Sequence, residues 1–262
     1  MHDILTQIVF HKRREVSDCK KRVPLGKLKQ QAAYHRVTFS LQKALLAGSG
    51  VIAEFKRASP SKGSIKENAD TGKIVRSYRE AGAAAISVLT DRHFFGAADN
   101  DLPAAREAVA LPVLRKEFII DPYQIYEAKA LGADAILLIA AILSPAEIRD
   151  FQHLATDLGL EVLVEVHHAE ELTKLTGEEQ LIGVNNRNLE TFTVDIATSL
   201  NLAGQLGGVV RVTESGLGPG TNLQALKTAG YQGFLVGESL MKATDPGLAC
   251  KLFIDRLKQL QP

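Results

Sequence analysis

The chain has 262 residues, and its 31 lysine and arginine residues nearly balance its 30 aspartate and glutamate residues. This balance argues against a nucleic-acid or membrane role driven by net charge, so we expect neither partner. A (βα)8 barrel typically runs to about 250 residues. A chain of this length buries roughly three-quarters of its unfolded surface and needs no disulfide or metal to fold.

The cysteine usage and the apolar runs bear on the compartment. Cys19 and Cys250 lie far apart, and neither belongs to a CxxC motif or a Cys/His cluster. Two such thiols are typical of a reducing compartment. The longest apolar run, residues 135–143, is too short to span a bilayer, and residues 1–10 lack the apolar centre of a signal peptide. We therefore expect a cytoplasmic protein.

The first fifty residues predict helices rather than strands. Residues 4–19 are amphipathic, and residues 39–46 form another short helical stretch. The apolar side of the first stretch carries Ile4, Leu5, Ile8 and Val16. Basic residues crowd this part, but Glu15 and Asp18 interrupt them, which favours a solvated helix face over a small nucleic-acid patch. We expect residues 1–50 to be a helical extension.

From residue 51 onward, short apolar runs alternate with polar stretches of helical periodicity. The apolar runs are residues 51–55, 84–89, 112–118, 135–139, 162–166, 181–185, 209–213 and 233–236. The helical stretches are residues 71–81, 101–109, 123–130, 144–158, 169–175, 194–206, 219–229 and 245–260. Such alternation predicts a parallel sheet, and eight cycles favour a closed barrel. We predict a single domain, residues 1–262, with a (βα)8 TIM barrel over residues 51–262. No GxGxxG follows the first strand, which weakens a dinucleotide-binding interpretation.

Functional groups in such a barrel gather at the carboxyl ends of the strands. Glu54 and Lys56 on the first strand point to one face, because strand side chains alternate. Charges inside an apolar strand are costly unless they are paired or functional. The alternatives are therefore a structural ion pair at the barrel mouth and a place in an active site. The polar loop 59–63 that follows is suited to cover a ligand.

The third strand contributes Lys116, which shares its parity with Leu114 and Phe118 and should therefore point into the barrel. We expect these apolar neighbours to lower its pKa, which would suit a general acid. The alternative is a surface lysine whose stem lies along apolar surface.

The fifth strand places Glu165 between two valines, which indicates a catalytic base or a buried ion-pair partner. His167 and His168 follow it and invite a metal interpretation. Adjacent residues on a strand point in opposite directions, so these two histidines do not easily share one metal. We predict no metal site.

The sixth strand ends with Asn185 and Arg187 on one face. The planar fork of an arginine suits a carboxylate, although a polar turn capped by asparagine is the alternative. The seventh and eighth strands end in TESG (residues 213–216) and VGES (residues 236–239). Phosphate sites in this fold often follow these two strands, where small residues let backbone N–H groups approach an anion. Glu238 would repel phosphate, so we expect its side chain to point away.

Together these segments resemble the indole-3-glycerol-phosphate synthase family of tryptophan biosynthesis, over almost the whole chain. The matching segments are IAEFKRASPSKG (52–63), VLRKEFI (113–119), LVEVH (163–167), IGVNNRNL (182–189), TESG (213–216) and LVGESLM (235–241). The resemblance implies a carboxy-lyase that uses no cofactor or metal. Its substrate would be 1-(2-carboxyphenylamino)-1-deoxyribulose 5-phosphate, and its products indole-3-glycerol phosphate, CO2 and water.

The resemblance also implies roles for individual residues. Lys116 would be the general acid at the sugar ketone, Glu165 the carboxylate of the dehydration, and Lys56 the holder of the anthranilate carboxylate and a second acid. The residues that orient these groups or bind substrate would be Glu54, Ser59, Asn185, Arg187, Glu214 and Ser215. The phosphate site would be lined by Gly216, Gly237 and Ser239. The expected partner is this small phosphorylated substrate, and the oligomeric state is open, a monomer included.

Three other interpretations stay open at this point. A phosphoribosylanthranilate-isomerase-like barrel would be expected to show a cysteine near the end of the first strand, where this chain has Glu54 and Lys56. A Schiff-base aldolase would use Lys116 as its nucleophile. A non-catalytic binding scaffold would have no need for several charged groups that face into the barrel.

Overall fold

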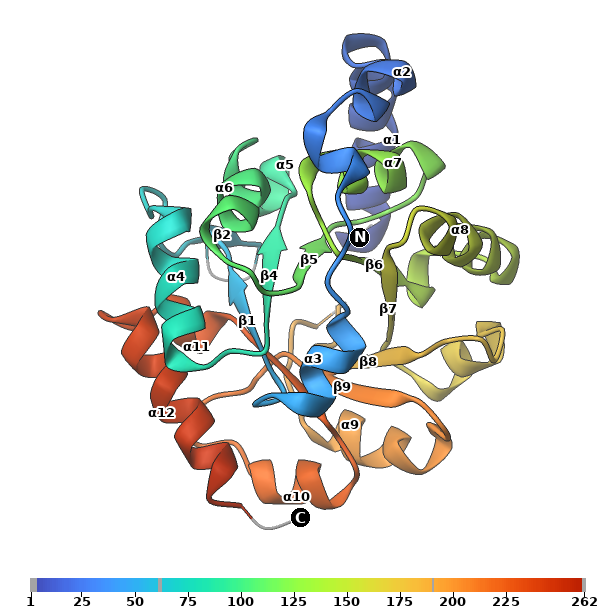
Figure 1. Ribbon diagram of the computed structural model, residues 1–262. Helices are drawn as coiled ribbons and strands as arrows, with labels where there is room; N and C mark the ends of the chain where they lie inside the picture. Colours follow the sequence, from blue (N-terminus) through green and yellow to red (C-terminus); the bar gives the residue numbers. More distant parts are fainter. Residues whose placement is uncertain (1–3, 61–62, 190, 261–262) are drawn as a thin grey trace.

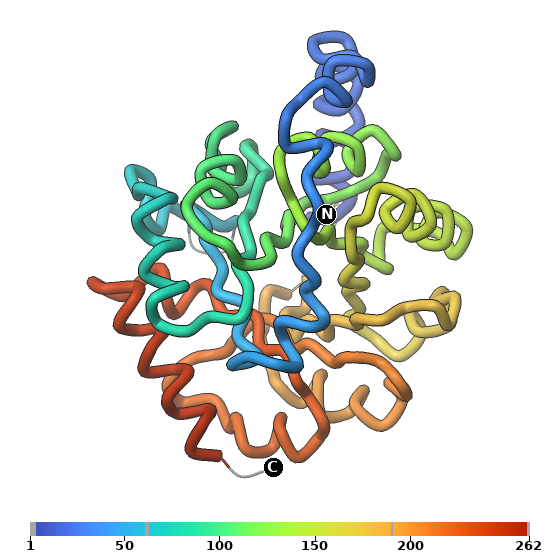
Figure 2. The backbone as a smooth tube through the Cα atoms, in the orientation of Figure 1, coloured from blue at the N-terminus to red at the C-terminus, as the bar shows by residue number. Residues whose placement is uncertain are grey.

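Eight parallel strands form a closed barrel in the computed structural model, which describes residues 4–60, 63–189 and 191–260 (Figures 1 and 2). Around the barrel, each strand pairs with the next one in the chain, and the last pairs with the first. The barrel strands are β1 (Val51–Phe55), β4 (Ala85–Leu89), β5 (Val113–Lys116), β6 (Ala135–Ile139), β7 (Glu161–Val166), β8 (Leu181–Asn185), β9 (Val210–Glu214) and β10 (Gly233–Val236). The predicted (βα)8 barrel is confirmed.

Helices surround the strands as an outer ring (Figure 1). The ring contains α4 (Thr71–Ala81), α6 (Asp101–Ala108), α7 (Pro122–Leu131), α8 (Pro145–Asp157), α9 (Ala197–Leu202), α10 (Leu223–Thr228) and α12 (Pro246–Lys258). Shorter elements sit in the loops: the hairpin β2 (Ala58–Ser59) and β3 (Gly63–Ser64), α5 (Arg92–Phe95), η2 (Ala140–Ile142), η3 (Ala169–Lys174), η4 (Ala203–Gln205) and α11 (Glu238–Met241). Before the barrel come α1 (Ile4–Arg22), α2 (Leu25–Lys29), η1 (Ala32–His35) and α3 (Leu41–Ala47).

Local sequence signals explain where the ring helices begin and end. The Asp70 side chain accepts a hydrogen bond from the backbone of Lys73 at the start of α4, and Gly82 ends that helix in a left-handed conformation with φ of 95°. Ser144 and Glu147 form a reciprocal capping box at the start of α8. These caps satisfy backbone groups that the helices themselves leave without partners.

Four predicted elements differ from the structure. The predicted helix 219–229 is shortened to α10, because its first turn begins only after Asn222, whose side chain accepts the backbone N–H of Ala225. The predicted strand 112–118 contributes only Val113–Lys116 to the barrel, because the Glu117 side chain bonds to the backbone N–H of Phe118 beyond it. The predicted helix 169–175 is the 3₁₀ helix η3, tied down where Glu171 accepts the backbone N–H of His167. The predicted helix 194–206 is shortened to α9 and then tightens into η4.

The core has two layers, and their arrangement leaves one end of the barrel open for chemistry. The larger layer lies between the strands and the outer helices. The smaller layer fills the barrel interior, where Leu114 and Leu163 lie in one cluster with Leu41 and Leu45 of α3. Because α3 packs into this cluster from before the first strand, it closes the amino end (Figure 1).

The N-terminal extension is fixed to the barrel by a buried charge. The Lys12 side chain is 1% exposed, and its Nζ lies 2.8 Å from Asp91 Oδ2, 3.0 Å from Glu117 Oε1 and 3.0 Å from Glu15 Oε2. Burial alone would lower the pKa of Lys12, but the three carboxylates outweigh it and raise that pKa. The prediction of a solvated helix face was therefore wrong at Lys12, because two of its three partners, Asp91 and Glu117, follow β4 and β5.

Within the described ranges, no helix combines the length and the apolar character needed to cross a bilayer.

Candidate active site

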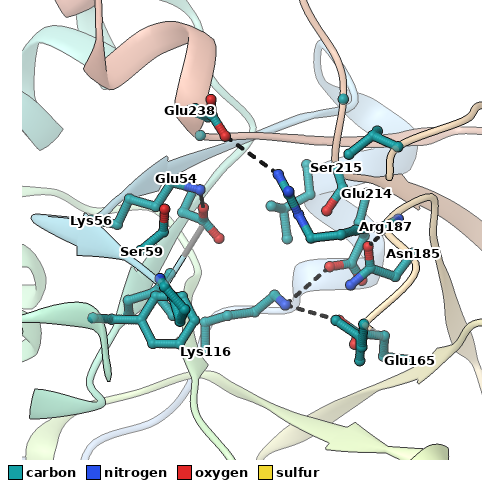
Figure 3. Close-up of a pocket in the computed structure, with 18 of the residues that line it drawn as sticks. Glu54, Lys56, Ser59, Lys116, Glu165, Asn185, Arg187, Glu214, Ser215 and Glu238 are labelled. Carbon is teal, nitrogen blue, oxygen red and sulfur yellow. Dashed lines mark hydrogen bonds and ion pairs between the residues drawn. The ribbon is translucent and has the colours of Figure 1, made fainter. Parts of the chain in front are cut away.

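A pocket of about 560 Å³ opens at the carboxyl ends of the barrel strands (Figure 3). Every predicted site residue lines it: Glu54, Lys56, Ser59, Lys116, Glu165, Asn185, Arg187, Glu214, Ser215, Gly216, Gly237 and Ser239. These residues come from β1, β5, β7, β8, β9 and the segments that follow them and β10. The structure thus brings together groups that are up to 185 positions apart in the chain, as from Glu54 to Ser239.

Strand alternation explains why these side chains converge. Lys116 follows the interior residue Leu114 by two positions, and Glu165 follows the interior residue Leu163 by two. The interior row of each strand therefore changes from apolar to charged at its carboxyl end. The predicted inward orientation of Lys116 is confirmed, because its Nζ reaches across to carboxylates on β7 and β9.

The centre of the site is a lysine between two carboxylates. Lys116 Nζ lies 2.9 Å from Glu165 Oε2 and 3.2 Å from Glu214 Oε2 (Figure 3). Burial alone would lower the pKa of Lys116, but the coulombic attraction of these two carboxylates and of Glu54 raises it well above its ordinary value. The expectation of a lowered pKa was therefore wrong. Apolar neighbours along β5 do not decide the pKa, because carboxylates from other strands lie closer to the amine.

The pKa values of the two carboxyl groups, Glu165 and Glu214, are shifted in opposite directions. Burial alone would raise the pKa of Glu165, but Lys116 and His167 outweigh it and hold that pKa well below its usual range. Burial raises the pKa of Glu214 to about 8, and the negative charge of Glu165 adds to this effect against the opposing pull of Lys116. At neutral pH, Glu165 is therefore a carboxylate and Glu214 holds a proton. Two acids whose pKa values differ in this way can serve as proton acceptor and proton donor at one site.

Gly183 on β8 makes room for Glu214. A Cβ atom at Gly183 would overlap Glu214 Oε1. Neither carboxyl oxygen of Glu214 accepts a hydrogen bond of good geometry within the described part of the chain, although Lys116 Nζ lies 3.2 Å from Oε2. Its hydrogen-bonding capacity is thus left for a ligand.

The pair on the first strand also faces the pocket. Lys56 Nζ lies 2.9 Å from Glu54 Oε1, so the two side chains share a face, as strand alternation predicted (Figure 3). A Cβ at Gly237 would overlap the Glu54 carboxylate. Glycine is therefore required here for steric reasons, in addition to any contact with phosphate. The Ser59 hydroxyl is buried at the pocket wall and has no hydrogen-bond partner among the described residues.

Arg187 and Glu238 form the next part of the rim. Arg187 Nη2 lies 3.3 Å from Glu238 Oε2 (Figure 3). On its other side, Lys242 Nζ lies 2.6 Å from Glu238 Oε1. The Glu238 side chain was expected to point away, but it lines the pocket because these two cations hold it there. Asn185 faces the pocket, and its side chain also accepts the backbone N–H of Arg187 at 3.0 Å. It is therefore both a pocket residue and the cap of a polar turn, the two alternatives that the sequence left open.

The two glycine-containing loops form one continuous wall. Ser215 has a left-handed φ of 68°, which is rare for a residue with a side chain, and Gly216 follows with φ of 74°. The Ser239 hydroxyl donates to the carbonyl of Leu217 at 2.8 Å, which joins the loop after β9 to the segment after β10. Strained backbone of this kind is often found where a site needs a fixed geometry.

Sequence analysis missed the apolar half of the pocket. Its apolar lining comes mainly from α1, the strands and the loops: Ile4, Leu5, Ile8, Leu89, Phe95, Phe118, Leu137, Ile139, Leu189, Phe192, Val194, Leu217 and Leu235. The apolar side of α1 was visible in the sequence, but nothing in the sequence showed that it faces the barrel mouth. This wall is suited to a planar aromatic ring.

The ligand-covering loop was predicted at residues 59–63. Ser59 and Pro60 line the pocket, whereas Ser61 and Lys62 lie outside the described residues. Within the described ranges, no group of three or more histidine, cysteine, aspartate or glutamate side chains is arranged to hold a metal ion.

Comparison with known proteins identifies the family. A sequence model of the family described as Indole-3-glycerol phosphate synthase matches residues 5–253. A protein from Bacteroides thetaiotaomicron named Indole-3-glycerol phosphate synthase is 46% identical over 260 residues, which cover 98% of this chain and 100% of that protein. One of the same name from Carboxydothermus hydrogenoformans is 46% identical over 261 residues, covering 95% and 99%.

A solved structure of thiamine phosphate pyrophosphorylase from Pyrococcus furiosus is similar in fold alone, with a TM-score of 0.59 and 15% identity. It covers 81% of this chain and 98% of its own. The family match, in contrast, runs over nearly the whole chain and includes every strand of the barrel. This chain therefore belongs to the indole-3-glycerol phosphate synthase family.

Proposed function

We propose that this chain converts 1-(2-carboxyphenylamino)-1-deoxyribulose 5-phosphate into indole-3-glycerol phosphate, CO2 and water. The observation that carries the proposal is Lys116, which lies between an ionised Glu165 and a protonated Glu214 on the floor of the pocket. Ring closure followed by dehydration needs both proton donors and a proton acceptor within one small space.

The pocket has a place for each part of the substrate. The apolar wall from α1 and the loops takes the aromatic ring, and Lys56 takes the carboxylate on that ring. The phosphate lies against the wall formed by Gly216, Gly237 and Ser239. The substrate carries about three negative charges, and nearby cations and backbone dipoles offset them.

In the first step, the ring carbon that bears the carboxylate attacks the sugar ketone, and a new carbon–carbon bond forms. Lys116 gives its proton to the ketone oxygen, which becomes a hydroxyl. The raised pKa of Lys116 keeps it charged in the resting site. The alkoxide that develops during the attack is basic enough to take that proton. The carbon–carboxylate bond then breaks, CO2 leaves, and its electron pair restores the aromatic ring.

The last step removes water from the new five-membered ring. Glu165 takes a proton from the carbon next to nitrogen, and the hydroxyl leaves with a proton from Lys56, which the departed carboxylate has freed. Glu54 holds Lys56 at 2.9 Å for this transfer. Asn185, Arg187, Glu214, Ser59 and Ser215 orient the substrate and these groups. A neutral Lys116 nucleophile, as an aldolase requires, is disfavoured by the raised pKa.

The proposal includes where and with what the protein works. A small phosphorylated molecule, rather than a nucleic acid or a membrane, is its partner, in keeping with the near-neutral net charge of +1. Its location is the cytoplasm, in keeping with two cysteines that are free thiols.

A direct assay tests the activity. The purified protein is incubated with the carboxyphenylamino sugar phosphate, and indole fluorescence is followed over time. We expect fluorescence to grow and one CO2 to be released for each indole formed. Folded protein that produces no indole would overturn the proposal. Trapping of Lys116 by borohydride in the presence of substrate would instead support a Schiff-base aldolase.

A further inference from the structure

His167 lies behind the site rather than in it. It follows the last residue of β7, its side chain is 4% exposed, and it does not line the pocket. Its Nε2 lies 3.3 Å from Glu165 Oε1, and its Nδ1 lies 3.6 Å from Glu171 Oε2. Because Glu165 Oε2 faces Lys116 at 2.9 Å, the two oxygens of this carboxylate face two different basic groups.

These contacts form a row in which acidic and basic side chains alternate. The order is Glu171, His167, Glu165, Lys116 and Glu214, which come from η3, the end of β7, β5 and β9. Glu171 is fixed at the far end, because its Oε2 accepts the backbone N–H of His167 at 2.6 Å.

Other basic groups near this row are engaged or point elsewhere. Lys174 on η3 donates its Nζ to the backbone carbonyls of Ala140 and Leu143, at 2.7 Å and 3.2 Å. The His168 side chain is exposed, and its ring centroid lies 6.3 Å from that of His167. The immediate charged neighbours of the His167 ring are therefore the carboxylates of Glu165 and Glu171.

We propose that His167 is a positioning residue for the dehydration step, held as an imidazolium between Glu171 and Glu165 so that Glu165 stays ionised and turned toward Lys116. The inference rests on the proposed function in one respect, since it takes Glu165 as the base of that step.

The electrostatics support a charged ring. Burial alone would lower the pKa of His167, but Glu165 and Glu171 outweigh it and raise the pKa to about 9. A cation 3.3 Å from Glu165 favours the ionised form of that carboxylate. Without this cation, the proton affinity of Glu165 rises, and one of its oxygens loses the group that fixes its orientation. The effect reaches the substrate only through Glu165.

The kinetic test compares His167→Gln with His168→Gln. The ring nitrogens of His167 make charge contacts with the two carboxylates but no hydrogen bond of good geometry. Glutamine keeps a polar N–H group near the position of Nε2 but carries no charge. For His167→Gln we expect kcat to fall ~10-fold or more, because the variant lacks the group that orients the reacting residue Glu165. The acid limb of the kcat profile should move up by about one pH unit, with KM changed less than about twofold because His167 does not line the pocket. His168→Gln should match the parent protein in all three measurements.

A second measurement needs no turnover. The ring nitrogens of His167 are followed by NMR between pH 5 and pH 10 in the resting protein, with His167→Gln used to assign the signal. We expect an imidazolium at pH 7, and a lower pKa of this ring in Glu171→Gln, which removes the outer carboxylate but keeps an acceptor for the backbone N–H. If His167→Gln fails to fold, Glu171→Gln gives the kinetic answer, with a smaller shift of the acid limb in the same direction.

The kinetic comparison and the NMR titration together separate the inference from the proposed function on which it rests. Failure to form indole while His167 titrates as an imidazolium would count against the proposed function alone. A neutral His167 ring at pH 7 would overturn the inference even in an active enzyme. So would an acid limb of the kcat profile that is the same in His167→Gln and in the parent protein.

Discussion

The two ends of the barrel bury charge in different ways. At the amino end, Asp134 precedes β6 and is fully buried. Its Oδ1 accepts from Arg36 at 2.5 Å and from the backbone of Phe39 at 2.8 Å. Its Oδ2 accepts from Arg106 at 2.5 Å and from the backbone of Val113 at 2.8 Å. Two hydrogen bonds reach each oxygen, so this carboxylate has little capacity left for a ligand.

At the carboxyl end, Glu214 is 1% exposed but lacks such a set of partners. Lys116 Nζ lies 3.2 Å from its Oε2, and its oxygens accept no hydrogen bond of good geometry from the described residues. Its raised pKa is the mark of a carboxyl group whose charge is poorly stabilised in the folded protein.

The difference shows what buried charge contributes at each end. A carboxylate with complete partners joins N-terminal and barrel segments and stabilises the fold. A carboxyl group with incomplete partners costs stability and is ready to interact with substrate. We therefore expect substitutions at the amino end to change unfolding and those at the carboxyl end to change turnover.

The largest effect is expected for Lys116→Ala. The substitution removes the proposed proton donor for ring closure, so kcat should fall by a factor of ~10²–10⁴ with the fold intact. Steady-state indole formation measures the loss, and circular dichroism checks the fold. A rate close to that of the parent protein would show that Lys116 is structural, and the two ends of the barrel would then be alike.

A large effect of the opposite kind is expected for Asp134→Asn. The substitution keeps the size of the side chain but removes the charge that faces Arg36 and Arg106, so the free energy of unfolding should fall by about 3 kcal/mol. Urea unfolding measures this loss. At a temperature where the variant is folded, its kcat should equal that of the parent protein. A lower kcat with unchanged unfolding would contradict the comparison.

Much of this arrangement could be predicted from the sequence, because it depends on local periodicity. The alternation of apolar runs and helical stretches predicted the barrel, and strand alternation predicted that Glu54 and Lys56 share a face and that Lys116 points inward. Both inferences need only the chain geometry within a few residues.

What could not be predicted depends on contacts between distant segments. The pKa of Lys116 is set by carboxylates 49 and 98 positions away, at Glu165 and Glu214, and neither is visible from the neighbours of Lys116 on β5. Lys12 is buried because Asp91 and Glu117 fold over it, although its sequence neighbours are polar. The apolar wall from α1 likewise required knowing where that helix packs.

The smallest effect in free energy is expected for Glu214→Gln, and its sign is the informative part. The pKa of Glu214 is raised from 4.5 to about 8. Between these values the unfolded chain releases a proton that the folded protein keeps, so the stability of the parent protein falls as pH rises through this window. Glutamine has no proton to release and avoids this cost.

The most direct measurement is therefore the unfolding of Glu214→Gln in urea at pH 4.5 and pH 8.5, beside its turnover. We predict near-equal stability at pH 4.5, a gain of about 1 kcal/mol or more over the parent protein at pH 8.5, and a kcat lower by a factor of ~10 or more. A variant that is less stable at pH 8.5 and still turns over normally would contradict the claim that the carboxyl end gives up stability for catalysis.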